Sequence, residues 1–264
     1  MWKFELLAKS VPKLKKPVLI VGLPGIGNVG KIAADFIIDE IKANRLYNIF
    51  SYDLPNSVFV NDQNLVELPT IEMYSKKRNG KNDILILTGD VQPADEKSSY
   101  EFCEKVLETA QKLDVGLVIT LGGIGLAEVP KKPQIFCTGN SKENINKFKR
   151  GLKLNEKLYG IVGPIIGVSG LMVGLAGRRK IPAVCLLAET LGHPAYLGIK
   201  GAREIVKVLN KKLELKIKIS KVDKEIEEIE SEILTRTQEL SKLSKQAALK
   251  KLRGRMQKET SYIG

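Results

Sequence analysis

The sequence contains few cysteines and a single histidine, and these shortages exclude several kinds of chemistry. Cys103, Cys137 and Cys185 are far apart and form no CxxC pair, which argues against a disulfide framework and against a structural zinc site. His193 would have to serve any Ser-His-Asp or Cys-His mechanism by itself. We therefore expect a reducing compartment and no bound metal, and a nucleophilic hydrolase is disfavoured.

An export signal and a convincing membrane span are also lacking. The N-terminus MWKFELLAKS has no apolar run before a small-residue cleavage site, so a cytoplasmic location is expected. Residues 158–177 are 20 residues without a charge, about the length that a bilayer needs. Six glycines and Pro164 dilute their hydrophobicity. We interpret the stretch as a buried, glycine-rich strand and helix, and we expect no membrane partner.

Acidic residues are fewer than basic residues. There are 43 Lys and Arg against 30 Asp and Glu, a net charge of +13, and residues 242–264 carry seven basic residues and one acidic residue. Such a tail is typical of proteins that meet nucleic acid or an acidic protein face, and also of a solvated helix end. No aromatic residue stands among these lysines before Tyr262. Stacking on bases is therefore unsupported, and nucleic acid is a disfavoured partner.

The apolar residues are arranged as strands that alternate with helices. At 264 residues and 43% hydrophobic content, the chain can build one large packed core. Residues 16–23 (KPVLIVGL) indicate a strand buried on both faces, and Val29, Ala33 and Ile37 follow at helical spacing. Further apolar runs occupy 84–88, 115–121, 134–138 and 183–188. This order predicts an α/β fold with a mostly parallel sheet that is covered by helices on both faces.

Residues 55–88 depart from that alternation. Turn residues at 61–64 and at 78–81 separate close-set apolar runs. Asn79 and Gly80 favour the left-handed backbone angles of a tight hairpin. We predict an antiparallel excursion from the parallel sheet in this region.

The composition changes again near residue 199, where glycines nearly vanish. An apolar seam at alternating three- and four-residue steps runs from Val208 to Ala247. A helix of this length cannot hide the seam by itself, so it pairs with a second copy, folds back as a hairpin or docks on the body. The seam residues that we expect to support homo-oligomerisation are Val222, Ile226, Ile229, Ile233, Leu240 and Leu243.

Three parts are predicted from this change in composition. Residues 1–198 form a globular α/β domain and residues 199–250 form a long C-terminal helical, coiled-coil extension. Residues 251–264 form a basic, flexible tail.

A glycine-rich loop suggests one kind of binding. Residues 25–30 (GIGNVG) match GxGxxG between a strand and a helix, the context in which such a loop holds a pyrophosphate. Asp53 lies near the position of a ribose-binding acid. Ile32 stands where a P-loop needs a hydroxyl, which disfavours ATP hydrolysis of that type. A tight strand-to-helix turn needs small residues anyway, so structural glycines are favoured and no cofactor is expected.

Polar residues also gather where the predicted strands end. Carboxyl ends of parallel strands line a ligand crevice, so Asp90, Glu128 or Glu189 could act as general base with His193 as proton shuttle. The same residue types are typical of turns and helix caps. The alternative function is a nucleotide- or nucleoside-handling enzyme that uses the glycine loop and this rim. The other rim residues are Thr88, Gly89, Gln92, Thr120, Gly122, Gly123, Cys137, Thr138, Gly139, Asn140 and Thr190.

Six phrases in a fixed order carry a more specific resemblance. They are GLPGIGNVGK (22–31), TGDVQP (88–93), TLGG (120–123), CTGN (137–140), IIGVSGL (165–171) and AETLGHP (188–194). Over roughly residues 16–200 the chain resembles archaeal members of the proteasome assembly chaperone family. The resemblance implies an α/β fold related to nucleoside phosphorylases without their activity. It also implies homo-oligomers with helical C-terminal extensions.

The resemblance also directs attention to the C-terminus. Some family members end in a hydrophobic residue, Tyr and one last residue, which insert between α-subunits of the proteasome core particle. This chain ends in Tyr262, Ile263 and Gly264, with Tyr third from the end instead of second. The resemblance implies that these residues bind proteasome α-subunits or a related assembly factor. We expect a non-catalytic, homo-oligomeric assembly chaperone or proteasome-binding protein.

Overall fold

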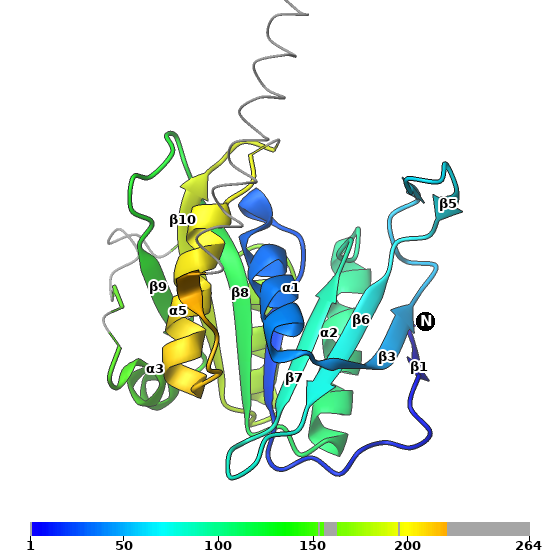
Figure 1. Cartoon of the computed structure of the whole chain (residues 1–264), viewed down its shortest axis with the longest axis horizontal. Coiled ribbons are helices and arrows are strands. Elements are labelled where there is room, and N and C mark those ends of the chain that lie inside the picture. The colour runs from blue at the N-terminus through cyan, green and yellow to red at the C-terminus, as the bar shows by residue number, and fades with distance from the viewer. Residues whose placement is uncertain (1, 153, 156–162, 195, 221–264) are drawn as a thin grey trace, which may run out of the picture. The chain divides into compact units, whose positions relative to one another are not determined.

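The computed structural model describes residues 2–152, 154–155, 163–194 and 196–220. Its contacts divide the chain into two units, Met1–Ile217 and Lys218–Gly264. All the helices and strands named below belong to the first unit (Figure 1).

One mixed sheet organises the first unit. Its strands are β1 (Lys3–Leu6), β2 (Val18–Gly22), β3 (Asn44–Phe50), β6 (Ile71–Lys76), β7 (Ile84–Gly89), β8 (Leu117–Leu126), β9 (Ile135–Gly139) and β10 (Ala183–Leu191). Their spatial order is β1-β3-β6-β7-β2-β8-β10-β9. The central strands β7, β2, β8 and β10 are parallel. The outer strands pair antiparallel. The α/β fold is therefore confirmed, but the sheet is parallel only in its centre.

Helices cover both faces of this sheet, as predicted (Figure 1). One face carries α1 (Val29–Ile41), α3 (Lys142–Lys149) and α5 (Ile199–Leu213). The other face carries α2 (Glu96–Lys112) and α4 (Val168–Arg178), which pack against each other. A short 3₁₀ turn, η1 (Ile26–Asn28), connects β2 to α1.

The predicted central strand is confirmed as β2. All five of its residues are buried, as expected for a strand covered on both faces. Leu19 and Val21 belong to the core beneath α2 and α4, and by alternation Ile20 faces the opposite layer. Burial of side chains of this size stabilises the fold by roughly 1.5–3 kcal/mol each.

The antiparallel excursion is also confirmed. β6 pairs with β7 in antiparallel register across a turn in which Gly80 has φ +70°. Farther out, β4 (Phe59–Val60) and β5 (Val66–Glu67) form a separate two-stranded hairpin. The Asn61 side chain accepts hydrogen bonds from the backbone N–H groups of Gln63 and Leu65 and so closes its turn. In Figure 1 this hairpin projects beyond the ends of β3 and β6.

The uncharged stretch 158–177 leads into α4. Val168 and Met172 are buried in the core, so the predicted buried helix is confirmed. Residues 163–167 form a loop, so the strand predicted before the helix is absent there. Within the described ranges, no helix combines the length and the apolar character needed to cross a bilayer.

Helix α5 belongs to the globular body, although the sequence pattern places the start of the extension at residue 199. Its Ile205 and Leu209 are fully buried, and the helix packs on α1 and β10. The helix ends at Leu213 because Glu214 adopts a left-handed conformation, with φ +50°. Ile217, which is also buried, is the last residue of the first unit. The rest of the predicted extension, from residue 221, lies outside the described residues.

Candidate functional site

The carboxyl ends of β7, β2, β8 and β10 lie at one edge of the sheet, which we call the rim. Residues 25–30 follow β2 and Asp90 follows β7. Glu128 lies two residues beyond β8, and His193 two residues beyond β10. Gly122–Gly123 and Glu189–Thr190, expected in turns, lie within β8 and β10 because both strands are longer than predicted.

One group of predicted rim residues lies at the opposite edge. β9 runs antiparallel to β10, with Val184 opposite Gly139 and Ala188 opposite Ile135. Residues 137–140 therefore lie beside the start of β10 rather than beside its end. Asn140 connects elements there, because its side-chain amide donates to the carbonyl of Ile181 and its oxygen accepts from the N–H of Ala183. The prediction that these four residues line the rim was wrong.

Protein atoms pack tightly against the glycine loop. A Cβ on Gly30 would lie 2.6 Å from the carbonyl oxygen of Leu121. Gly27 has φ +62°, and a Cβ there would lie 2.8 Å from Oγ1 of Thr190. The carbonyl of Gly27 accepts a hydrogen bond from the N–H of Gly198 at 2.7 Å. These contacts agree with the structural interpretation of the glycines.

Asp53 does not lie beside the glycine loop. It follows β3, and β6 and β7 separate β3 from β2 in the sheet. In a dinucleotide-binding fold the ribose-binding acid follows the strand beside the first one. The Ser51 hydroxyl donates to the Asp53 carboxylate at 2.6 Å and lowers the pKa of that group. The ribose role suggested for Asp53 therefore has no basis in the strand order.

Asp90 is held in a network of hydrogen bonds and charges at the rim. It accepts hydrogen bonds from the N–H and hydroxyl of Thr70 at 3.0 and 2.8 Å, and Lys31 Nζ lies 3.6 Å away. Burial by itself raises the pKa of Asp90, but the Thr70 bonds and the Lys31 charge outweigh it, so this pKa lies below its usual value. A carboxylate with a lowered pKa is a weak general base at neutral pH.

The other two candidate bases lie in different surroundings. Glu189 is buried and accepts a hydrogen bond from the N–H of Gln134 at 3.0 Å, which links β10 to the start of β9. Glu128 and His193 are exposed. Within the described part of the chain, no group of three or more His, Cys, Asp or Glu side chains is placed to hold a metal ion.

The cysteines are buried free thiols. Burial raises the pKa of Cys103 and of Cys185 to about 12 and that of Cys137 to about 11. The thiols therefore stay protonated at neutral pH, and the thiolate is the nucleophilic form. These cysteines serve as small core side chains.

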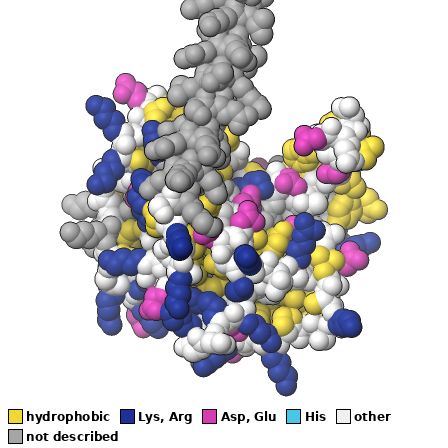
Figure 2. All heavy atoms as spheres, viewed as in Figure 1, with side chains coloured by type: hydrophobic (Ala, Val, Ile, Leu, Met, Phe, Trp, Pro, Cys, Tyr) yellow, Lys and Arg dark blue, Asp and Glu magenta, His cyan; other side chains and the backbone are white. Residues whose placement is uncertain are grey.

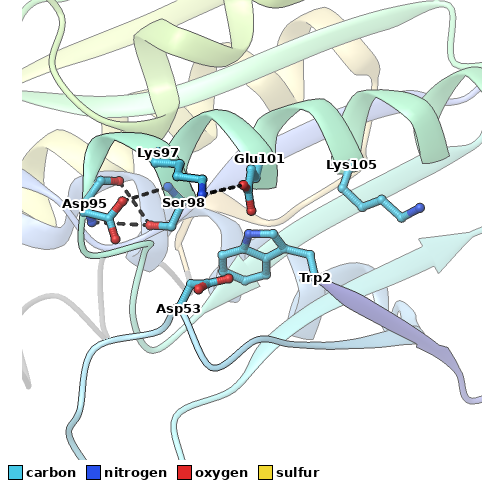
Figure 3. Close-up of a pocket in the computed structure, with 7 residues that line it drawn as sticks. All are labelled: Trp2, Asp53, Asp95, Lys97, Ser98, Glu101 and Lys105. Atoms are coloured by element: carbon cyan, nitrogen blue, oxygen red, sulfur yellow. Dashed lines mark hydrogen bonds and ion pairs between the residues drawn. The ribbon is translucent and has the colours of Figure 1, made fainter.

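Sequence reasoning missed the surface between β1 and α2. Trp2 packs on Phe102 of α2, with ring centroids 4.7 Å apart. A hollow of about 590 Å³ opens beside Trp2 between Asp53 and the start of α2 (Figure 3). An adjoining groove of about 530 Å³ runs along β1 toward Leu113. The alternation of apolar Trp2, Phe4 and Leu6 with charged neighbours was the available signal for this edge strand.

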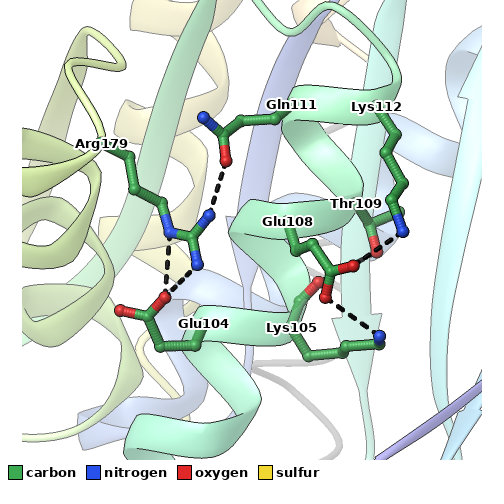
Figure 4. A network of polar contacts seen from close by, with 7 residues as sticks. All are labelled: Glu104, Lys105, Glu108, Thr109, Gln111, Lys112 and Arg179. Carbon is green, nitrogen blue, oxygen red and sulfur yellow. Dashed lines mark hydrogen bonds and ion pairs between the residues drawn. The ribbon is translucent and has the colours of Figure 1, made fainter.

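Charged residues on α2 form a network along this helix (Figure 4). Glu108 accepts from Lys105 at 3.0 Å and from Lys112 at 2.7 Å. Hydrogen bonds from Lys112 and Lys105 lower the pKa of Glu108 to about 2. On the side toward α4, Arg179 donates from Nε to Glu104 at 2.9 Å. The network holds two lysine ammonium groups at the β1 side of the helix.

Comparison with known sequences identifies the family of this chain. A sequence profile of the PAC2 family matches residues 19–235. The chain belongs to the PAC2 family.

Solved structures of similar proteins agree with this assignment. PbaB of Pyrococcus furiosus, described as an archaeal proteasome activator, is 28% identical with a TM-score of 0.80, over 90% of this chain and 98% of PbaB. PbaA of the same organism, described as an archaeal homolog of proteasome-assembly chaperone, is 26% identical with a TM-score of 0.72, over 99% of each chain. The resemblance to the proteasome assembly chaperone family is thereby confirmed.

A relative found by sequence comparison matches over a similar length. The uncharacterized protein MJ1210 of Methanocaldococcus jannaschii is 29% identical over 238 residues, which make up 90% of this chain and 86% of that protein. These comparisons give no support to the alternative of a nucleotide-handling enzyme. The seam residues from Val222 to Leu243, and Tyr262, Ile263 and Gly264, lie outside the described residues and stay predictions.

Proposed function

We propose that this protein is a non-catalytic, proteasome assembly chaperone-like or proteasome-binding protein that acts as a homo-oligomer. The observation that carries the proposal is the similarity to PbaB, which extends over 90% of this chain at a TM-score of 0.80. The similarity to PbaA, over the whole length of both chains, supports the same function.

The rim agrees with a non-catalytic role. The glycine loop is packed against Leu121 and Thr190, and Asp90 is engaged by Thr70 and Lys31. A general base is most efficient when its pKa lies near the working pH, and the pKa of Asp90, one of the three candidate bases, lies below its usual value. The protein would act by presenting surfaces to other polypeptides.

The C-terminal residues supply the proposed contact with the proteasome. Tyr262, Ile263 and Gly264 would bind between α-subunits of the core particle, or on a related assembly factor, with Tyr262 as the aromatic anchor. The excess of basic residues over 242–264 would steer this tail toward acidic surfaces. Steering of this kind weakens as added salt screens the charges.

A pull-down with archaeal proteasome core α-subunits as prey tests this function. We expect full-length protein to recover the α-subunits, and a chain ending at Ser241 to lose them. Tyr262→Ala should weaken binding by about thirtyfold, the effect of losing an anchor worth ~2 kcal/mol, whereas the control Ser261→Ala should change little. Recovery should fall as salt rises.

Two results would contradict parts of the proposal. Equal recovery by the full chain and by the chain ending at Ser241 would show that the tail is not the docking element. If the full chain recovers no α-subunits even at low salt, the proteasome partner itself is wrong.

A further inference from the structure

One segment of this basic chain is acidic. Residues 51–70 contain Asp53, Asp62 and Glu67 and no Lys or Arg, which gives a charge of −3. Because the whole chain carries +13, the other 244 residues together carry +16. A second copy of the chain is therefore a partner of opposite charge for this segment.

The β4–β5 hairpin within this segment carries an exposed aliphatic face. Val60 pairs with Val66, and Phe59 pairs with Glu67. Cross-strand partners lie on the same face of a hairpin. Because every second side chain along a strand points to the same face, Val58 and Leu68 lie on the face that carries Val60 and Val66. These four side chains are 51–67% exposed. Figure 2 shows hydrophobic and acidic side chains together on the projecting lobe.

Such a hairpin needs a partner. An isolated two-stranded hairpin is marginally stable in water, and clustered exposed apolar side chains mark a contact surface. Its tight turn and the Asn61–Glu67 hydrogen bond of 2.7 Å hold the strands in register. The hairpin therefore presents a preformed aliphatic face, with the Asp62 carboxylate at its turn, to whatever covers it.

The groove along β1 is complementary to this face. Its apolar lining consists of Trp2, Phe4, Val11, Tyr47 and Leu113, and its polar lining of Lys3, Lys105, Thr109 and Lys112. Within the described residues no Asp or Glu lines it. The lining includes three lysines, and the Glu108 carboxylate beside the groove offsets the charge of one of them. The groove therefore carries about two net positive charges. A volume of about 530 Å³ accommodates several side chains, being within the range of ~300–1,000 Å³ for ligand sites.

We propose that the β4–β5 hairpin of one copy docks in the β1–α2 groove of a second copy, with Val60 and Val66 on the apolar floor. Asp62, in the turn that joins the two strands, then faces the groove lysines. This proposal rests on the homo-oligomer of the proposed function and names its interface. The same chain does not supply the contact, because the hairpin's own valines are exposed in its structure.

The contact is head-to-tail, because hairpin and groove are different surfaces of one chain. Each copy uses its hairpin on one neighbour and its groove on the next. Contacts of this kind generate rings when the rotation closes and filaments when it does not. The same hairpin–groove contact can also form twice within one dimer. In that arrangement a two-fold axis relates the two copies, and each hairpin lies in the groove of the other copy.

Thiol cross-linking of the full chain tests the pairing directly. Val11→Cys and Val66→Cys place reactive thiols on the groove and on the hairpin, at residues 48% and 67% exposed. The native cysteines are buried, so the wild type serves as background. With a short bis-maleimide, we expect a double variant to give linked dimers and larger species and each single variant to give none. A link within one chain, or links between identical single variants, would overturn the proposal.

A charge placed on the aliphatic face tests the same contact without cross-linking. Val66→Asp should lower the average mass in sedimentation at least twofold, and Gln63→Asp, which adds the same charge at the turn, should not. Val66 is exposed, so the folded chain tolerates the change.

The outcomes separate this proposal from the proposed function. If the wild type is oligomeric but Val66→Asp keeps its mass and the double cysteine variant gives no linked species, only the docking is overturned. If the wild type sediments as a monomer at micromolar concentration, the homo-oligomer of the proposed function is overturned as well. Proteasome binding is measured separately, by the pull-down.

Discussion

Gly25 and Gly30 belong to the same glycine pattern, but the structure uses them differently. A Cβ on Gly25 would meet nothing within 4 Å, and one on Gly30 would lie 2.6 Å from the Leu121 carbonyl oxygen. Gly30 thus sets how closely α1 approaches β8. The pattern in the sequence shows both glycines as equivalent, because the contact that distinguishes them comes from a strand about 90 residues away along the chain.

Substitution of these two glycines should therefore have unequal effects. We expect Gly30→Ala to lower the free energy of unfolding by about 1–3 kcal/mol, because the added methyl group overpacks a rigid backbone contact. Gly25→Ala, in extended backbone with open space around it, should change that free energy by under ~0.5 kcal/mol. Urea denaturation measures both. Equal losses would contradict the structural assignment of the loop.

Asp90 gives a pH-dependent prediction at the same scale. Its pKa is lowered in the folded protein, so its contribution to stability is present above the unfolded pKa, ~3.9, and is lost as pH falls through the folded pKa. We expect Asp90→Asn to lower the free energy of unfolding by about 1 kcal/mol at pH 7. This figure is small for a charged hydrogen bond because Asp90 is partly exposed to solvent.

The pH profile provides the check on that substitution. The difference in urea midpoint between wild type and Asp90→Asn should shrink as the pH falls below 4. If Asp90→Asn lowers the urea midpoint equally at pH 7 and at pH 3, the charge of the Asp90 carboxylate is not the source of the stabilisation.

Among the elements, α2 is central because it contributes to the core, the polar network and the groove. Its start is defined by Asp95, whose side chain accepts from the N–H of Ser98 at 2.8 Å. The Ser98 hydroxyl in turn accepts from the N–H of Asp95 at 3.3 Å. Phe102 and Val106 anchor its inner face. The helix is therefore held by a cap at one end and by packing along its length.

Removal of the cap should loosen that first turn. We expect Asp95→Ala to lower the free energy of unfolding by ~1 kcal/mol, and Asp95→Asn, which keeps the accepting oxygen, to lose much less. Thermal or urea unfolding of the three proteins measures the difference. If the Asn variant is as unstable as the Ala variant, the stabilisation comes from charge and not from the hydrogen bond.

The direction of β9 differs from the prediction, because this strand runs antiparallel to its neighbour β10. The strand itself was predicted, but it was expected to follow the parallel order. Only residues 127–134 connect β8 to β9, and a parallel connection needs a dozen or more residues to cross the sheet. The short connection was a usable signal for an antiparallel strand, and it would have removed residues 137–140 from the predicted rim.

For the molecule as a whole, charge and apolar surface are distributed unevenly. An acidic, aliphatic hairpin projects from a chain that is otherwise strongly basic. The proposed assembly joins this hairpin to the β1–α2 groove and its lysines, whereas the proposed proteasome contact uses the basic tail. The two contacts use different residues, so each can be removed by substitution without removing the other.

Local pattern in the sequence was sufficient for the α/β class, β2, α1, the antiparallel hairpins and the family phrases. Side-chain periodicity and turn chemistry act between near neighbours, which is why a linear pattern reveals them. The strand order, the engagement of Asp90 by Thr70, the separation of Asp53 from the glycine loop and the β1–α2 groove were decided by the tertiary structure. Each depends on packing between segments distant along the chain, and local propensity does not specify which segments meet.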